Sequence, residues 1–177
     1  MNINEHNVIT ELPFSLPGII FRSPMPYGTY DLNGDVLEEY QRVGISTIVI
    51  LASDDECMLK ARRDLRQLYT QQGYKVIYFP IEDFSIPPSL EELDRTISEV
   101  LKCVHSKENV VIHCSAGIGR TGLFTACLAA KVLNCGSDEA IKWVRQYFYA
   151  VEMPEQEEFV RRYKQFIAKS CSGFNVT

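Results

Sequence analysis

The sequence predicts an α/β protein, with a central, mostly parallel sheet of four or five strands flanked by helices. Short runs rich in apolar and β-branched residues recur along the chain, which is typical of buried strands. They alternate with longer segments whose apolar residues follow helical spacing, and this alternation is typical of a parallel sheet covered by helices. The predicted strands are residues 18–21, 46–51, 75–79 and 110–112.

The composition suits one globular domain. The chain has 177 residues, of which 46% are hydrophobic and 23% charged, and this is enough to bury a sizeable core. The formal net charge of −5 is not the basic charge that is typical of proteins that bind nucleic acid or an anionic membrane, so we expect neither as a partner. The six cysteines show no C-x-x-C pair and no zinc spacing. Without a signal peptide or a bilayer-spanning apolar run, we expect a soluble, cytoplasmic monomer with reduced thiols.

The predicted domain occupies residues 17–169, between an N-terminal arm at 1–16 and a C-terminal tail at 170–177. The arm begins with polar residues and is expected to be loose. No internal repeat and no low-complexity linker divides the chain, so we expect a single folded unit.

Two helices are predicted between the first three strands after the arm. The first opens at Asp35 and stops at Gly44, a residue type favoured just beyond a helix C-terminus. Ser53 and Glu56 have the spacing of a capping box, with serine at the N-cap and glutamate three residues later. The helix that begins there carries apolar residues at helical spacing and is expected to end near Gly73.

Four further helices are predicted in the second half of the chain. A capping box at Ser89 and Glu92 opens a helix with one apolar stripe, which indicates that it faces the core. Residues 123–133 are typical of a buried helix. Ser137 is expected to cap the next helix, and Pro154 suits the first position of the last one.

The stretch 110–122 is the most informative part of the sequence. A buried strand leads into a short loop that begins at Cys114 and ends at Arg120, where a helix opens. The first N–H groups of a helix lack intrahelical partners and the helix dipole adds positive potential, so this loop is predicted to bind a tetrahedral anion such as phosphate. Gly117 and Gly119 allow the backbone to curl around the anion. Arg120 adds a planar cation that can bind two phosphate oxygens.

The same positive field acts on the cysteine at the start of the loop. It favours the thiolate form of Cys114 at neutral pH. A thiolate beneath a bound phosphoryl group is a nucleophile aimed at phosphorus, so the sequence predicts phosphoryl transfer through cysteine. His113 lies on the buried strand just before it, where a ring hydrogen-bonded to loop carbonyl groups would make the anion site rigid. We expect this structural role for His113 and not direct proton transfer.

The motif H-C-x-x-G-x-x-R-T-G at residues 113–122 resembles the signature of the cysteine-dependent protein tyrosine phosphatase superfamily. The short chain looks like the compact dual-specificity group of that superfamily, and the resemblance covers roughly residues 17–168. It implies a phosphate-binding loop between a strand and a helix of an α/β fold. It also implies hydrolysis of a phosphorylated protein or peptide through a cysteinyl-phosphate, without metal or cofactor.

The resemblance implies a role for each residue of the loop. Cys114 would be the nucleophile, and Arg120 and the backbone N–H groups would hold the phosphoryl oxygens. The hydroxyl of Thr121 would donate to the sulfur and make it a better leaving group in the second step. The expected substrate-binding residues are Ser115, Ala116, Gly117, Ile118, Gly119 and Arg120 of the loop, with Gln156 from a later segment.

The general acid is expected on the segment 80–88, an irregular stretch stiffened by prolines. Breaking an aryl phosphate ester requires a proton for the leaving oxygen, which a positioned carboxylic acid supplies. In the superfamily this acid lies roughly thirty residues before the cysteine, and Asp83 precedes Cys114 by 31 positions. We therefore predict that Asp83 acts as acid in the first step and as base in the second. Glu82 is the adjacent alternative.

Residues 152–159 resemble the glutamine loop of tyrosine phosphatases, with Gln156 and Phe159 in register. The larger tyrosine-specific enzymes have a water-positioning glutamine where this chain has Glu152. That departure leaves open how the second chemical step is organised.

The predicted substrate is phosphotyrosine in a protein, with activity on phosphoserine and phosphothreonine left open. The loop interior, residues 115–119, carries no charge, whereas crowded phosphates need local countercharge. The apolar Ile118 suits an aryl ring better than a second phosphate. The alternatives are a phosphoinositide or other small-molecule phosphatase of the same superfamily, a phosphate-binding pseudoenzyme, and a rhodanese-like sulfurtransferase.

Two residues outside these motifs carry open alternatives. Arg22 either reaches the phosphate site or, as we expect, braces a loop. Cys57 is either a redox partner that traps oxidised Cys114 as a disulfide or, as we expect, a spectator on a helix face.

Overall fold

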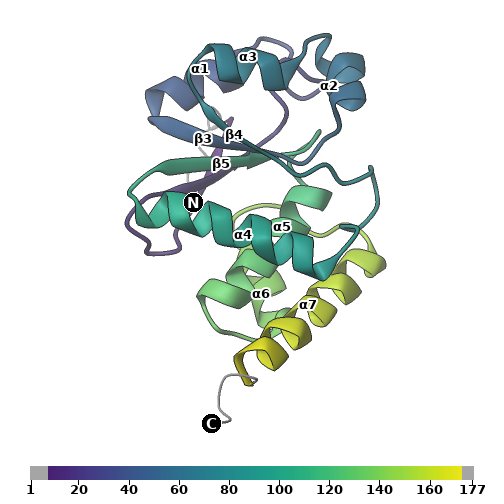
Figure 1. Cartoon of the computed structure of the whole chain (residues 1–177). Helices are drawn as coiled ribbons and strands as arrows, with labels where there is room; N and C mark the ends of the chain where they lie inside the picture. The colour runs from purple at the N-terminus through teal and green to yellow at the C-terminus, as the bar shows by residue number, and fades with distance from the viewer. Residues whose placement is uncertain (1–7, 173–177) are drawn as a thin grey trace.

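A five-stranded sheet forms the centre of the molecule, in the order β1-β2-β5-β3-β4 (Figure 1). The computed structural model describes residues 8–172, the last two by backbone alone. Strands β2, β5, β3 and β4 run parallel, and β1 pairs antiparallel with β2. The strands are β1 Thr10–Leu12, β2 Ile20–Ser23, β3 Ile45–Ile50, β4 Lys75–Tyr78 and β5 Asn109–His113. The predicted α/β fold with a mostly parallel sheet is confirmed.

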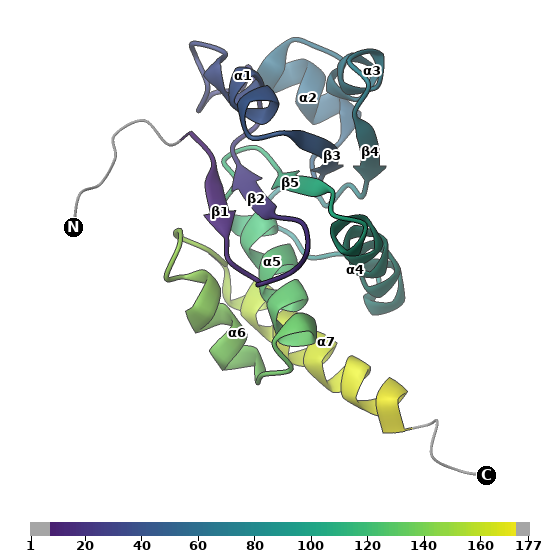
Figure 2. The same cartoon turned by 90° about the vertical axis from the view of Figure 1, so that its left-hand side faces the viewer.

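Helices cover both faces of this sheet, with α1 to α3 on one side and α4 to α7 on the other (Figures 1 and 2). The helices are α1 Asp35–Arg42, α2 Asp54–Ala61, α3 Leu65–Gln71, α4 Leu90–His105, α5 Gly119–Val132, α6 Ser137–Val144 and α7 Pro154–Ser172. None of the helices in the described part of the chain is both long and apolar enough to cross a membrane.

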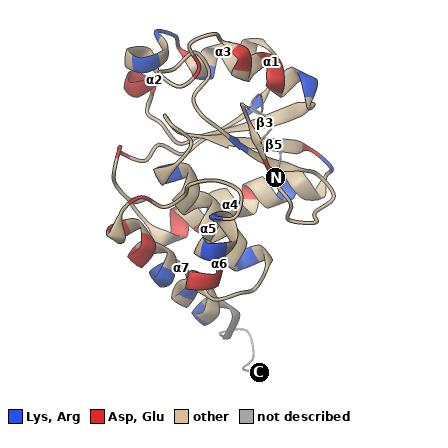
Figure 3. Ribbon diagram, turned by 180° about the vertical axis from the view of Figure 1, so that it is seen from behind, with Lys and Arg blue, Asp and Glu red and all other residues tan. Residues whose placement is uncertain are grey.

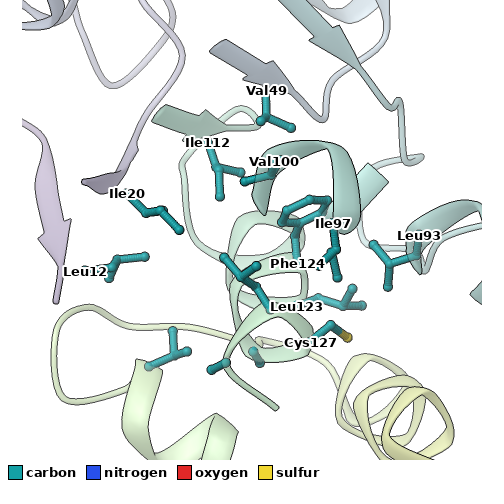
Figure 4. Close-up of a cluster of buried hydrophobic side chains, with 14 of the residues drawn as sticks. Leu12, Ile20, Val49, Leu93, Ile97, Val100, Ile112, Leu123, Phe124 and Cys127 are labelled. Carbon is teal, nitrogen blue, oxygen red and sulfur yellow. The ribbon is translucent and has the colours of Figure 1, made fainter. Parts of the chain in front are cut away.

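Each face of the sheet has its own hydrophobic core, because successive strand residues point to opposite sides. On β3, Ile48 and Ile50 pack toward α1 to α3, and Val49 packs toward α4 and α5. The second core is centred on α5, whose Leu123 and Phe124 meet side chains of β5 and α4 (Figure 4). Helix α5 is buried along nearly its whole length, so its N-terminus is held firmly below the end of β5.

The N-terminal arm predicted for residues 1–16 is wrong over residues 9–14. Residues 10–12 form β1, and the side chains of Ile9, Leu12 and Phe14 are buried. A strand of three residues is too short a signal to stand out in the sequence, but pairing with β2 satisfies the backbone groups of residues 10–12. Residues 1–7 lie outside the described part. At the other end, α7 continues through Ser172 into the predicted tail, whose last five residues are also outside it.

The helix predicted from Ser53 to Gly73 is two helices. The capping box opens α2 as expected, with Ser53 Oγ accepting from the N–H of Glu56 at 3.2 Å. The chain then leaves the helix at Arg62, which has a left-handed φ of 54°. Asp64 starts α3 by accepting from the N–H of Gln67 at 2.9 Å. The N-cap residue Asp64 therefore divides the predicted helix in two, although the apolar residues of the whole segment keep helical spacing.

The other helix boundaries agree with the local signals, apart from the starts of α5 and α6. Helix α5 begins at Gly119, four residues before the predicted start. Ser89 Oγ caps α4 by accepting from the N–H of Glu92 at 2.9 Å. Gly44 follows α1 with a φ of 68°, a conformation that glycine adopts readily. Ser137 is the first residue of α6 and not its cap, because Gly136 holds the N-cap position.

Candidate active site

The loop between β5 and α5 is held in one conformation by a glycine. Gly117 has a φ of +72°, and a Cβ at this position would lie 2.2 Å from the carbonyl oxygen of Ser23. Only glycine fits there without displacing the backbone. The N–H of Met25 donates to the carbonyl oxygen of Ser115 at 2.9 Å and ties the loop to the segment after β2. The loop is thus fixed at the point where the N–H groups of α5 begin.

A cavity of about 300 Å³ opens at this loop, at the carboxyl ends of the parallel strands. This is the edge at which ligands bind in open α/β sheets. The structure brings seven of the predicted site residues to its wall: Asp83, Cys114, Ser115, Ala116, Gly119, Arg120 and Gln156.

Arg120 is buried beneath the loop and is held by α2. Its side chain is only 2% exposed, and its two terminal nitrogens donate to the two carboxylate oxygens of Glu56 at 2.7 and 2.8 Å. A further bond of 3.0 Å reaches the carbonyl oxygen of Ile81. Burial would raise the pKa of Glu56, but the hydrogen bonds from Arg120 and Lys60 hold that pKa below its usual value. The guanidinium is therefore fixed in position before any ligand binds.

Asp83 reaches the same guanidinium from the opposite side of the cavity. Its Oδ1 lies 2.9 Å from a terminal nitrogen of Arg120, and its Oδ2 lies 3.1 Å from Nζ of Lys60. The side chain remains 43% exposed, so the carboxylate sits at the mouth of the cavity. Glu82 is exposed and does not line the cavity. The geometry therefore favours Asp83 over Glu82 as the acid.

Lys60 is a site residue that sequence reasoning missed. Its Nζ donates to Glu56 at 2.8 Å, to Asp83 at 3.1 Å and to Oγ of Ser115 at 3.0 Å. It thus joins α2, the acid segment and the phosphate loop. In the sequence, Glu56 and Lys60 have the spacing of an ordinary surface ion pair within a helix, and nothing local shows that they face a cavity.

Two exposed aromatic side chains also line the cavity. Tyr30, in the segment before α1, is 61% exposed, and Phe84, which follows Asp83, is 66% exposed. Ile118 was expected to offer an apolar contact to the substrate, but it does not line the cavity. Because Ile118 is the N-cap residue of α5, its position is governed by the start of that helix. The large apolar side chains of the cavity wall belong instead to Tyr30 and Phe84.

His113 supports the loop from below. It is completely buried, with Nδ1 3.0 Å from the carbonyl oxygen of Cys114 and Nε2 3.2 Å from the hydroxyl of Tyr69. Burial lowers the pKa of His113 to about 4, so the ring is neutral at neutral pH. A neutral ring beside a carbonyl must donate from Nδ1, and its Nε2 then accepts from Tyr69.

The stability of the protein is expected to fall as the pH drops below about 6.5, because unfolding releases His113 to bind a proton. The folded pKa lies below the unfolded one, so the unfolded state holds more protons between these values. The free energy of unfolding then rises with pH by up to about 1.4 kcal/mol per unit in this window. Urea unfolding between about pH 7 and 5 measures this slope, which a His113→Asn variant should lose. An NMR titration of His113 near pH 6.5 would contradict the assignment.

Gln156 lines the cavity and also holds two segments together through its amide. Its Oε1 accepts from the N–H groups of Glu152 and Met153 at 3.0 and 3.4 Å, and its Nε2 donates to the carbonyl oxygen of Ser85 at 3.3 Å. The amide therefore joins the turn before α7 to the acid segment. The carboxylate of Glu152 lines the cavity above Gly119, where an added Cβ would lie 2.4 Å from its Oε2.

The contacts of three other residues bear on the expectations, and only those of Thr121 differ from them. The hydroxyl of Thr121 is buried and has no hydrogen-bond partner among the described residues, so the expected bond to the sulfur of Cys114 is not formed. Arg22 braces the fold, with Nε 3.0 Å from Oγ1 of Thr10 and its guanidinium 4.9 Å from the ring centre of Phe148. Burial raises the pKa of Cys57 to about 12, so this thiol stays protonated, and its redox pairing stays a prediction.

Comparison with known proteins agrees with this geometry. Residues 27–136 match the model of a family described as "Polymorphic toxin system, DSP-PTPase phosphatase". An uncharacterized protein of Methanocaldococcus jannaschii is 40% identical over 89 residues, which make up 49% of this chain and 58% of that protein. The match thus spans little more than half of that relative's length.

Solved structures show the same fold. A kinase-associated phosphatase whose catalytic site cysteine is replaced by serine superposes with a TM-score of 0.81 at 22% identity, covering 90% of this chain and 95% of that one. Tk-PTP in its active form superposes with a TM-score of 0.73 at 26% identity, covering 88% and 97%.

The fold, the cysteine loop and the family match place the chain in the superfamily of cysteine-based tyrosine and dual-specificity phosphatases. Within that superfamily, the chain belongs to the DSP-PTPase phosphatase family.

Proposed function

We propose that this protein hydrolyses phosphotyrosine in proteins or peptides through a cysteinyl-phosphate intermediate. The observation that carries the proposal is that Cys114, Arg120 and Asp83 line one cavity although Asp83 comes from a separate segment. Such a cavity combines a nucleophile, a fixed cation and a carboxyl group, which are the three components that the reaction requires.

In the first step, the sulfur of Cys114 attacks phosphorus as the bond from phosphorus to the tyrosine oxygen breaks. Asp83 gives its proton to that oxygen, and the product is a phenol. Arg120 and the N–H groups at the start of α5 hold the non-bridging oxygens. Because Asp83 pairs with Arg120 in the absence of substrate, an arriving phosphoryl group takes over that cation and releases the carboxylate. The released carboxylate takes up a proton from solvent before it donates that proton to the leaving oxygen.

In the second step, water attacks phosphorus, the bond from phosphorus to sulfur breaks, and inorganic phosphate leaves. Asp83 accepts the proton of the water, and Glu152 adds a second carboxylate to the same cavity wall. The departing thiolate needs a hydrogen bond, and the unpartnered hydroxyl of Thr121 is the donor that we assign to it. Cytoplasmic location and a monomeric state stay predictions.

The walls of the cavity favour an aryl phosphate. Tyr30 and Phe84 present exposed rings on which the tyrosyl ring can pack. The loop residues 115–119 carry no charge, and the charge of Lys60 is balanced by Glu56 and Asp83. A single phosphoryl group is thus better matched than the several phosphates of a phosphoinositide.

Phosphotyrosine peptides are expected to exceed matched phosphoserine peptides and phosphoinositides in kcat/KM. Each aromatic contact contributes roughly 0.5–1.5 kcal/mol, so Tyr30→Ala and Phe84→Ala should each lower kcat/KM for phosphotyrosine by about 2- to 10-fold. Phosphoserine, which has no ring, should be little affected. Tyr149→Ala is the matched control, because Tyr149 is exposed but does not line the cavity. Equal or higher kcat/KM for a phosphoinositide would overturn the proposal.

A further inference from the structure

A second cavity, of about 520 Å³, adjoins the one that contains Cys114. Two chain segments pass from one cavity to the other without interruption. Thr29 and Tyr30 line the first cavity, and residues 31–34 line the second; likewise, Lys60 lines the first and residues 61–63 line the second. Because consecutive Cα atoms are only about 3.8 Å apart, the linings of the two cavities meet along both segments.

Two arginines give the second cavity its chemistry. Arg62 and Arg63 line it, and within residues 8–172 neither forms an ion pair with a carboxylate. Their neighbour Arg66, by contrast, is paired with Asp54. In Figure 3 the ribbon is blue where α2 turns toward α3, which is the position of these basic residues. Two unpaired guanidinium groups in a concave surface are suited to binding an anion.

The surroundings hold these cations in place and leave their charge unbalanced. The guanidinium of Arg63 lies 4.1 Å from the ring centre of Tyr27, a cation–π contact that orders it. Asp31 is the acidic residue of this wall, but its carboxylate oxygens accept from the backbone N–H groups of Tyr27 and Val36 at 2.8 and 3.3 Å. Its charge is thus directed at the backbone of its own loop and not at the arginines.

We infer that this cavity is an anion subsite for the peptide that carries the target phosphotyrosine. It would take an acidic side chain or a second phosphoryl group on that peptide. The inference rests on the proposed function. The anion would lie on a residue close to the phosphotyrosine in the peptide, because the linings of the two cavities are consecutive along two segments of the chain. We favour a peptide over a lipid surface because the net charge of −5 opposes approach to an anionic membrane.

The test compares three phosphotyrosine peptides that differ only in the flanking position: neutral, glutamate or phosphoserine. The wild type is expected to prefer the two anionic peptides in kcat/KM. The double variant Arg62→Gln/Arg63→Gln should lose about 2- to 10-fold of that preference, the range for exposed charge pairs. High salt should reduce the preference of the wild type in the same way. If only the phosphoserine peptide is preferred, the subsite takes a phosphoryl group and not a carboxylate.

Two controls keep the outcomes separate. p-Nitrophenyl phosphate has no flank and should be hydrolysed equally by the wild type and the double variant. Arg95→Gln removes a 76% exposed arginine from α4, outside both cavities, and should leave the peptide preference intact.

Equal kcat/KM for all three peptides in the wild type would overturn the subsite and leave the proposed function standing. A preference that survives in the double variant would overturn it too, as would a variant that loses phosphoinositide hydrolysis alone. Phosphotyrosine peptides that are not hydrolysed at all would overturn both proposals.

Discussion

The variant Cys114→Ser is expected to lose turnover by at least about 10⁴-fold and still bind phosphorylated ligand, because only the nucleophile is removed. The anion site is built from other groups. Arg120 is fixed by Glu56, and the loop conformation is set by Gly117 and by the bond from Met25 to Ser115. The measurement pairs p-nitrophenyl phosphate turnover with the affinity of the variant for a labelled phosphotyrosine peptide.

Further arms of this experiment test the mechanism. Cys135→Ser is the matched control, since this free thiol lies outside the cavity and should leave turnover unchanged. Orthovanadate, which resembles phosphate and can adopt the trigonal-bipyramidal geometry of the transition state, should inhibit the wild type, whereas EDTA should not. Turnover that depends on an added metal ion, or a Cys114→Ser variant that remains active, would refute the nucleophilic mechanism.

The variant Asp83→Asn is expected to lower kcat by roughly 10²–10⁴, the usual contribution of general acid catalysis. The loss should be larger for a poor leaving group such as phenol than for p-nitrophenol, because the poorer leaving group depends more on protonation. The basic limb of the pH–rate profile should flatten, since the acid that loses its proton there is absent. A leaving-group series with aryl phosphates measures these effects.

The structure adds an expectation for binding by this variant. In the free protein, the carboxylate of Asp83 occupies Arg120 and Lys60, so it competes with an incoming phosphoryl group. Removing its charge should lower the inhibition constant of inorganic phosphate while kcat falls. Glu82→Gln is the matched control, because Glu82 lies outside the cavity. If Glu82→Gln shows the leaving-group dependence and Asp83→Asn does not, the acid is the adjacent residue.

Features that depend on short stretches of chain could be predicted from the sequence alone. Alternating buried strands and amphipathic helices predicted the mostly parallel sheet, because periodicity is a local property. The side chains of the capping residues Ser53 and Ser89 accept hydrogen bonds from N–H groups three residues away. Because these contacts are also local, the caps could be predicted from the sequence. The loop from Cys114 to Arg120 is also local, since one strand, one turn and one helix start are enough to build an anion site.

The distant residues that contact that loop could not be predicted from the sequence and are known from the folded structure. Glu56 and Lys60 are more than fifty positions from the residues they contact there, and their spacing is that of an ordinary helix pair. The break after Ala61, which places Arg62 and Arg63 beside the second cavity, contradicts the helical spacing of the run. These contacts depend on how α2 and the segment after β4 pack at one edge of the sheet. That packing depends on side chains from many segments together, so it cannot be predicted from any single stretch of the sequence.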